Sequence, residues 1–379
     1  MGLPSFDTAE PRRVGKTIAR TLIVLVGIGA AGYLLAAHGL EQVFRALQLV
    51  GWSGLAAVTL VHAVATLLCA IAWWLLLCAF SDARWSTFLW VRWLRDGLGA
   101  VVPVMPVSGE LIGMRMLAMR GVALADAGTV ADLTAELLTQ AAFAATGFVL
   151  LHRSRPHAPY QIWIVVGIGA MVLQYVGFLF AQRKGLFRLI QHPFDWLTKR
   201  GRVGASSAED DAPLHERILR VYHQHTAFYG CLALHFVAWI ITGLEMWLGL
   251  WFMGQPRSVA DVLILESLVY AIRASTFFIP LGAGVQEGGY VLIGGLLGID
   301  ATVALAVALL KRGRDLLIGV PALLCWQLLE AGNFRRARQT DVDEASVSAG
   351  DAVAAARNII AAPPIAPAQV IVPADPSER

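Results

Sequence analysis

Long runs of apolar residues, separated by short polar connections, make up most of the chain. A hydrocarbon core of roughly 30 Å needs about 20 helical residues to cross it. Six runs are of this order, and their apolarity is continuous rather than alternating, which favours helices over barrel strands. They cover residues 20–37, 55–80, 130–151, 160–181, 226–253 and 301–329. The pattern predicts an all-α polytopic membrane protein with six clear spanning helices.

The composition agrees with this fold class and excludes several functions. Of the 379 residues, 57% are hydrophobic and 15% are charged, which is too apolar for an ordinary soluble domain. The net charge of +3 lies mostly in the connections and forms no basic groove, so nucleic acid is not an expected partner. Packing roles are predicted for the cysteines, which lie in apolar spans without metal-ligand spacing: Cys69, Cys78, Cys231 and Cys325. We expect neither a metal nor a cofactor.

Lys and Arg are unequally distributed between the two alternating sets of connections. One set contains the segment before residue 20, the connection that holds Arg84 and Arg92, residues 183–220 and the start of the tail. The other set holds only Arg45, Arg153, Arg155 and Arg257. Because cytoplasmic loops carry the excess of basic residues, both termini are predicted to be cytoplasmic.

These assignments divide the chain into three parts. Residues 1–19 form a cytoplasmic segment, and residues 20–330 form the transmembrane domain with a cytoplasmic loop at 182–225. Residues 331–379 are rich in Ala and Pro and are predicted to be a disordered cytoplasmic tail.

An internal repeat lies within the transmembrane domain. PVMPVSGELIGMRMLAMRGV at 103–122 aligns without a gap with PLGAGVQEGGYVLIGGLLGI at 280–299, at an offset of 177. The alignment pairs two prolines, two acids and two glycines: Pro103 with Pro280, Glu110 with Glu287, and Gly121 with Gly298. The same offset superposes the flanking spans, so the repeat halves are about 55–151 and 232–328. Each half reads as helix, hairpin, helix.

Three predicted crossings separate the two hairpins, which puts the hairpins on opposite faces of the membrane and predicts an inverted repeat. Each hairpin arm either spans the membrane or turns back within it; both leave this parity unchanged. Proline and glycine permit such breaks at membrane depth and allow close packing. The predicted hinge residues are Pro103, Pro106, Gly109, Gly121, Pro280, Gly282, Gly284, Gly288 and Gly298.

Ionisable residues inside membrane spans are costly and indicate function. Glu110 and Glu287 fall where a helix would begin, and two interpretations stay open: capping of that helix, or coupling to a proton or ion. Asp132, Glu136 and Gln140 share one helix face. The equivalent helix of the second half carries a basic group, Lys311, Arg312 and Arg314, with Asp315.

The acidic and basic sets could pair across the pseudo-symmetry axis, or the basic set could hold an anionic headgroup. Glu245 and Glu266 are single acids in apolar spans, for which a structural and a functional role stay open. Trp85, Trp90 and Trp93 are predicted to be interfacial anchors rather than a substrate cage. The predicted lipid path consists of Glu110, Glu287, Arg95, Arg273, Arg312, Arg314 and Glu136.

The run IPLGAGVQEGG resembles the second hairpin of the lysylphosphatidylglycerol synthase membrane region and of related stand-alone flippase-like proteins. GELIGMRMLAMRGV, DLTAELLTQ and ALLKRGRDLLIG are similar to the branch associated with bacterial hopanoid biosynthesis. The resemblance covers residues 18–333. It implies a bacterial inner-membrane protein that moves lipid between leaflets or delivers it onward. A tail follows where the synthases carry a soluble aminoacyl-transferase domain, so aminoacylation is not expected.

We therefore predict a lipid transporter or flippase that works by alternating access on a membrane lipid, hopanoid or phospholipid, and not an enzyme. VGKT at 14–17 lacks the first glycine of a phosphate-binding loop, which argues against ATP coupling. Two alternatives stay open. One is an intramembrane lipid-modifying enzyme with Asp132 and Glu136 as acid and base; the other is a scaffold for lipid-biosynthesis or export proteins.

Overall fold

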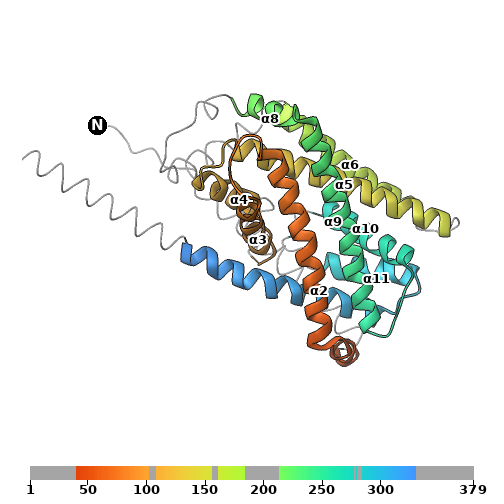
Figure 1. The fold of residues 1–379 in the computed structure, drawn as a ribbon. Helices are drawn as coiled ribbons and strands as arrows, with labels where there is room; N and C mark the ends of the chain where they lie inside the picture. Colours follow the sequence, from red (N-terminus) through yellow and green to blue (C-terminus); the bar gives the residue numbers. More distant parts are fainter. Residues whose placement is uncertain are drawn as a thin grey trace, which may run out of the picture. The chain divides into compact units, whose positions relative to one another are not determined.

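The computed structural model describes residues 40–101, 108–155, 161–183, 213–276, 279 and 284–329, and these are α-helical apart from short turns (Figure 1). The predicted all-α class is confirmed for this part of the chain. Several predictions lie outside the described residues: the first span at 20–37, most of the loop at 182–225, the tail at 331–379, and the hinges Pro103, Pro106, Pro280 and Gly282.

The chain divides into two compact units, Met1–Leu324 and Cys325–Arg379. The helices of the first unit are α2 (Leu40–Leu77), α3 (Trp85–Val101), α4 (Ser108–Met119), α5 (Ala125–Ser154), α6 (Gln161–Arg183), α8 (Leu214–Tyr222), α9 (His225–Phe252), α10 (Val259–Ser275) and α11 (Val285–Leu296). Residues 301–324 form one more helix, called the last helix here. In the second unit, residues 325–329 are helical.

Three helices in the described part of the chain are long and apolar enough to cross a membrane: Leu47–Leu77 within α2, Ala125–Ser154 and His225–Phe252. They coincide with three of the predicted spans. The predicted span at 160–181 is the helix α6, and the span that begins at 301 is the last helix with the residues that follow it.

The second arms of the two hairpins have the same length and the same ending. α4 and α11 are 12 residues long, and their bounds differ by the predicted offset of 177. Each is followed by a glycine with positive φ, 72° at Gly121 and 73° at Gly298. The backbone N–H of the next residue donates a hydrogen bond back to the helix. Val122 donates to Leu117 O (3.1 Å), and Ile299 donates to Gly294 O (2.8 Å). These glycines end the helices in a left-handed turn that other residues adopt at a cost.

The first arms of the two hairpins, α3 and α10, do not follow the predicted offset of 177. α3 and α10 are both 17 residues long, but their bounds differ by 174. The connection between the arms is three residues longer in the second half, which restores the offset of 177 at α11. The helices before the hairpins are also equivalent, because Trp74 and Trp247 each donate an indole N–H to a carbonyl in the next connection, Ala83 O (3.1 Å) and Arg257 O (3.2 Å).

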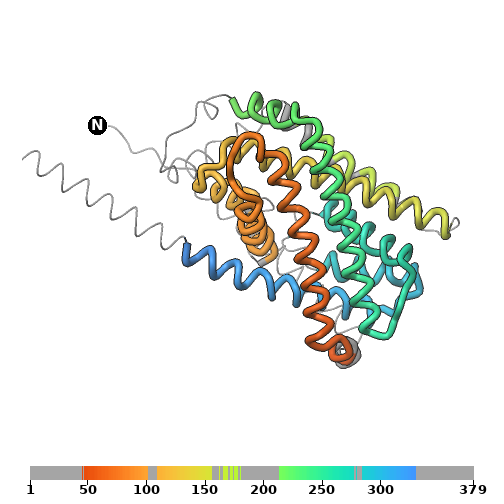
Figure 2. The backbone as a smooth tube through the Cα atoms, in the orientation of Figure 1, coloured from red at the N-terminus to blue at the C-terminus, as the bar shows by residue number. Residues whose placement is uncertain are grey.

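The two equivalent long helices, α2 and α9, pack along each other in opposite directions (Figure 2). Near one end, a Cβ on Gly54 would lie 3.1 Å from the Phe252 ring; near the other, a Cβ on Gly230 would lie 3.4 Å from Leu75. Between them, His62 Nδ1 lies 3.2 Å from Glu245. Since residue numbers rise along one helix as they fall along the other, the pair is antiparallel.

Two apolar cores hold the helices together, and each includes residues from outside one half. One core joins α2, α3, α4 and α5 with α8 and the start of α9, around residues such as Trp73, Phe88 and Leu117. The other joins α9, α10, α11 and the last helix with parts of α2 and α5, around residues such as Leu268 and Tyr290. Burial of these side chains fixes the helices that carry the charged residues described below.

The contact between α5 and α10 depends on Gly147. A Cβ at this position would lie 1.7 Å from Ser267 Oγ and 2.9 Å from Ser267 Cβ. We expect Gly147→Ala to destabilise the protein by about 1–3 kcal/mol through overpacking. Gly169→Ala in α6, where the added atom meets open space, is the matched control. Thermal melting of both variants in detergent tests this, and equal melting temperatures would contradict it.

Candidate functional site

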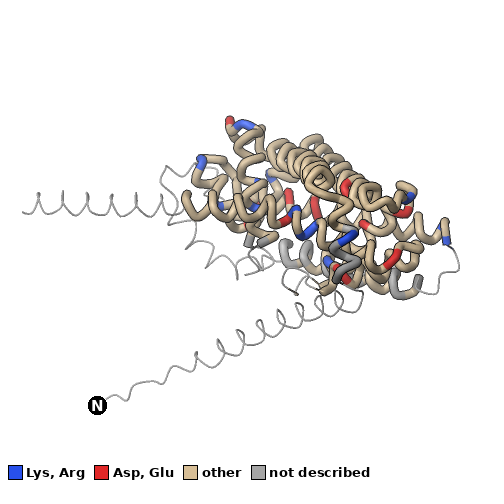
Figure 3. Tube along the Cα trace, turned by 90° about the horizontal axis from the view of Figure 1, so that it is seen from below, with Lys and Arg blue, Asp and Glu red and all other residues tan. Residues whose placement is uncertain are grey.

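Two groups of charged residues lie inside the bundle, and Figure 3 shows acidic and basic positions near one another in its central part. We call them the first and the second cluster. The first cluster consists of Arg92, Arg95 and Asp96 on α3, Glu110 on α4, Asp132 and Glu136 on α5, and His235 on α9. The second consists of His62 on α2, Glu245 on α9, Glu266 on α10, Glu287 on α11, and Lys311, Arg312, Arg314 and Asp315 on the last helix.

Two arginines and two acids form the centre of the first cluster. Arg92 donates to Asp132 and Glu136, both at 3.2 Å, and Arg95 donates to the same two acids at 2.9 and 3.1 Å. The Asp132 side chain has no exposed surface, and each arginine is 3% exposed. Transfer of such ions from water costs several kcal/mol each, so the charge-assisted bonds between them are what permit their burial.

Further groups extend the first cluster to neighbouring helices. Arg95 also donates to Glu110 at 3.3 Å, which ties α4 to α3. Close approach is possible because a Cβ on Gly109 would lie 2.6 Å from the Arg95 carbonyl oxygen. His235 Nε2 lies 2.9 Å from the second oxygen of Asp132, so α9 also contacts the cluster.

The second cluster is built around the last helix. Lys311 donates to Glu266 on α10, and Tyr290 donates to the other oxygen of that acid at 3.0 Å. Arg314 donates to Glu245 on α9, and its Nη1 lies 3.0 Å from His62 Nδ1 on α2. The cluster therefore connects α2, α9, α10 and the last helix.

Glu287 has a capping role and also forms an ion pair. Its Oε2 accepts the backbone N–H of Gly284 at 2.9 Å, at the start of α11, where φ of Gly284 is 75°. Its Oε1 accepts from Arg312 at 3.2 Å. The carboxylate thus stabilises the helix start, as one of the two interpretations of the sequence expected. Its equivalent, Glu110, pairs with Arg95 on the preceding arm.

The acidic face of α5 and the basic set of the last helix do not pair with each other. Asp132 and Glu136 bind arginines of their own half, and Lys311 binds Glu266 of its own half. The links between the halves come from two histidines, because His62 of α2 joins the second cluster and His235 of α9 joins the first.

Other predicted site residues lie apart from these bonds. The guanidinium of Arg273 lies over the Tyr270 ring at 5.5 Å, and the ion pairs of the described residues do not include it. Gly288 lies inside α11 with its N–H bonded to Gly284 O, so the chain does not break there. Gln140 accepts from Tyr175 of α6 at 2.6 Å.

The sequence interpretation missed several cluster members. Arg92 was assigned to a cytoplasmic connection, which is wrong, because it lies within α3 and is buried. Its i, i+4 partner Asp96, bonded at 2.7 Å, was the available signal. The isolated histidines His62 and His235 in apolar spans were a second signal.

Asp132, Cys231 and His235 are the one set of described residues with metal-binding geometry, since their ligand atoms lie within 4.8 Å of one another. Asp132 is already bonded to two guanidinium groups, and a divalent cation beside it would face both positive charges. The set therefore fits a hydrogen-bonded network better than a metal centre.

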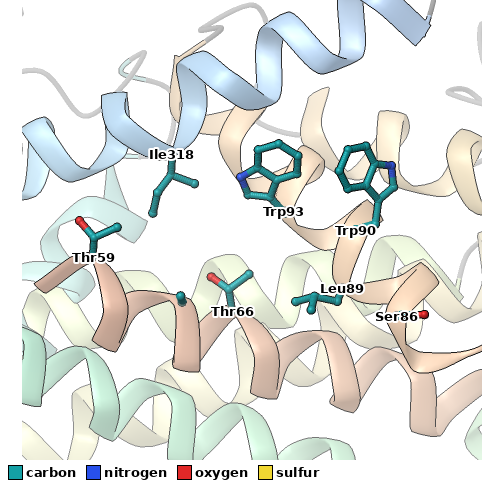
Figure 4. A pocket seen from close by; sticks show the side chains of 8 residues that line it. Thr59, Thr66, Ser86, Leu89, Trp90, Trp93 and Ile318 are labelled. Carbon is teal, nitrogen blue, oxygen red and sulfur yellow. The ribbon is translucent and has the colours of Figure 1, made fainter. Parts of the chain in front are cut away.

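A cavity of about 400 Å³ opens between α2, α3 and the last helix (Figure 4). Trp90 and Trp93 line it, whereas Trp85 is 48% exposed, and the role of all three as membrane-interface anchors stays a prediction. A smaller cavity shares part of its walls and is lined by His62, Asp96 and Asp315 of the two clusters.

Long apolar helices with paired charges between them define a helical membrane protein. The family model for the lysylphosphatidylglycerol synthase TM region matches residues 18–322, so the chain belongs to this family. The family suggested by the sequence motifs is thereby confirmed, and the hopanoid branch stays a prediction. Neither the curated proteins nor the solved structures compared with the chain give a match.

The first cluster predicts a large difference between two acids of α5. Asp132→Asn would leave Arg92 and Arg95 buried beside a neutral side chain, and we expect a loss of about 3–5 kcal/mol in the free energy of unfolding. Asp126→Asn removes a pair with Arg217 (2.6 Å) in which the Asp126 side chain is 26% exposed, and the expected loss is smaller, about 1 kcal/mol. Thermal melting of the two variants in detergent compares their stability. Equal losses of stability would contradict a buried network around Asp132.

The Lys311–Glu266 pair predicts strong non-additivity. Lys311→Met or Glu266→Gln alone leaves one partner buried without its counter-charge, whereas the double variant leaves neither. We expect the double variant to be more stable than the sum of the single losses implies, by at least about 1 kcal/mol. A double-mutant cycle on unfolding measures this. Additive losses would show that the two side chains do not interact.

Proposed function

We propose that the protein is an integral membrane lipid transporter that moves an amphipathic lipid, hopanoid or phospholipid, between leaflets or toward the outer membrane. The observation that carries this proposal is an amphipathic cavity beside two buried charge clusters, each built mainly by one half of a repeat and joined by one histidine of the other half. Apolar walls suit the body of a lipid, and charged groups at one end suit a headgroup. Membership of the lysylphosphatidylglycerol synthase family supports a lipid-related role.

We infer further that the two halves form an inverted repeat across the membrane. The equivalent helices α2 and α9 are antiparallel, which is the relation that two inverted halves require. Transporters with this architecture expose a central site to the two sides in turn by moving one half against the other. Within the same proposal, the membrane is the bacterial inner membrane, and both termini are cytoplasmic.

The charge balance of the clusters supports coupling to a proton or cation gradient. The first cluster sets four carboxylates against two guanidinium groups and a histidine, and the second sets four carboxylates against Lys311, Arg312, Arg314 and a histidine. An excess acid can take up a proton and thereby break an ion pair that holds two helices together. Glu110 and Glu287, each on the second arm of a hairpin, are the proposed coupling residues.

An enzymatic role is less well supported by the geometry. Asp132 and Glu136, the pair considered as acid and base, each accept bonds from both Arg92 and Arg95. A general acid or base needs a free oxygen beside the reacting atom. Both oxygens of Asp132 are engaged, because His235 lies at the second one, whereas both bonds to Glu136 go to Oε2. A scaffolding role for lipid-biosynthesis or export proteins would be compatible with transport and would require no movement of the clusters.

Leaflet-resolved transport in proteoliposomes tests the proposal. Fluorescent phosphatidylethanolamine and a fluorescent hopanoid serve as probes, and reduction by external dithionite reports the outer leaflet. We expect the protein to accelerate exchange of at least one probe over protein-free vesicles, and Glu287→Gln to reduce the acceleration at least tenfold. Asp82→Asn, an exposed acid outside both clusters, is the control. Exchange of both probes at the protein-free rate would sink the proposal.

A further inference from the structure

The large cavity has an aromatic and apolar wall. Its described lining includes Thr59 and Thr66 from α2, Ser86, Trp90 and Trp93 from α3, and Ile318 from the last helix (Figure 4). The rings of Trp90 and Trp93 lie with their centroids 5.0 Å apart and form a continuous surface. A volume of about 400 Å³ is at the low end of ligand sites and suits one hydrocarbon segment rather than a whole lipid.

The small cavity continues this surface toward the charge clusters. Thr66, Trp93 and Ile318 line both cavities, and His62, Asp96 and Asp315 line only the small one. Its volume is about 30 Å³ against about 400 Å³ for the large cavity, so it is a narrow end of the same surface. An amphipathic ligand whose body fills the large cavity can therefore place a polar end group here.

Among the described residues, the carboxylates that line the small cavity are Asp96 and Asp315, beside His62. The side chains of Asp96 and Asp315 are 32% and 23% exposed, whereas those of Arg92 and Arg314 are 4% and 6% exposed. Each arginine bonds its aspartate from the buried side, Arg92 to Asp96 at 2.7 Å and Arg314 to Asp315 at 2.5 Å. The carboxylates thus lie between the cavity and the positive charges.

This arrangement discriminates among headgroups by charge. A phosphate or carboxylate in the small cavity would face two carboxylates of like charge. A hydroxyl or a primary ammonium donates hydrogen bonds to them. Since the wall of the larger cavity is mostly apolar, with hydroxyls at Thr59, Thr66 and Ser86, it suits an apolar body that carries the polar group at its end.

We propose that the groove formed by the two cavities binds a lipid whose apolar body ends in a hydroxyl or a primary amine, held between Asp96 and Asp315. The inference rests on the proposed lipid transport and specifies its substrate class. The sequence suggested an anionic headgroup bound by basic residues such as Arg314. The groove favours a headgroup that donates hydrogen bonds to Asp96 and Asp315, which lie between the cavity and the arginines. Asp96 belongs to the first half and Asp315 to the second, so the bound group links the two halves and favours one of their arrangements.

Quenching of tryptophan fluorescence by brominated lipids tests this on the purified full chain in detergent. The probes are dibromooctadecylamine, dibromooctadecanol, dibromooctadecanoic acid and dibromooctadecyl phosphate, which share one chain and differ only in the terminal group. The Trp90→Phe/Trp93→Phe double variant gives the quenching of the other tryptophans, and its difference from wild type reports the groove.

We expect the amine and the alcohol to quench this component saturably, at concentrations at least tenfold lower than those needed for the two anionic probes. Equal or stronger quenching by the acid or the phosphate would overturn the proposal. So would the absence of groove quenching by all four probes, because the groove would then be closed to lipid in the protein.

Variants of Asp96 and Asp315 provide a second test. Asp96→Asn/Asp315→Asn is expected to reduce the preference for the amine over the acid at least tenfold, while Asp82→Asn retains it. Because the selectivity series needs only the wild-type protein, a double variant that fails to fold leaves the proposal falsifiable. A well-folded double variant that retains the full preference would overturn it.

The binding and transport measurements can fail independently. Amine- and alcohol-selective binding without any accelerated lipid exchange would uphold the groove and reject transport. Accelerated exchange with a groove that prefers anionic probes would uphold transport and reject this substrate class.

Discussion

The cost of burying charge in an apolar bundle is the constraint on which the arrangement of the helices depends. Every fully buried acid described above lies within hydrogen-bond distance of a basic group or a histidine, and most of these partners come from a different helix. Because an uncompensated charge would cost several kcal/mol, these bonds specify which helices lie side by side and in which register. Apolar packing between the same helices is less directional.

The two halves place their acidic and basic residues on exchanged helices. In the first half, the hairpin arm α3 carries the arginines and the following helix α5 carries the acids. In the second half, the arm α10 carries the acid Glu266, and the last helix carries Lys311 and Arg314. The backbone repeat is therefore preserved while the charge pattern is exchanged. We infer that the two halves respond differently to a proton or a charged ligand, which would make the two states of a transport cycle unequal.

What the sequence predicted well was local. The prolines, glycines and acids of the two hairpins stand at fixed spacing along the chain, so α4 and α11, their glycine turns and the equivalence of Glu110 and Glu287 could be found by alignment. The partners of the charges could not, because Arg92 meets Asp132 across 40 positions and Arg314 meets His62 across 252. The shift of α3 and α10 by three residues was also hidden, since it arises in the connection between the arms, where no apolar pattern fixes the register.

The relation of the two halves across the membrane is the central claim, and sided labelling tests it most directly. Cysteines would be placed at the exposed positions Arg120 and Asp300, beside the equivalent turns after the two hairpins, with the four native cysteines replaced. Labelling uses a membrane-impermeant maleimide on oriented vesicles. Inverted halves with cytoplasmic termini predict that Arg120→Cys reacts only in inside-out vesicles and Asp300→Cys only in right-side-out vesicles. Reaction of both cysteines from the same side would contradict an inverted repeat.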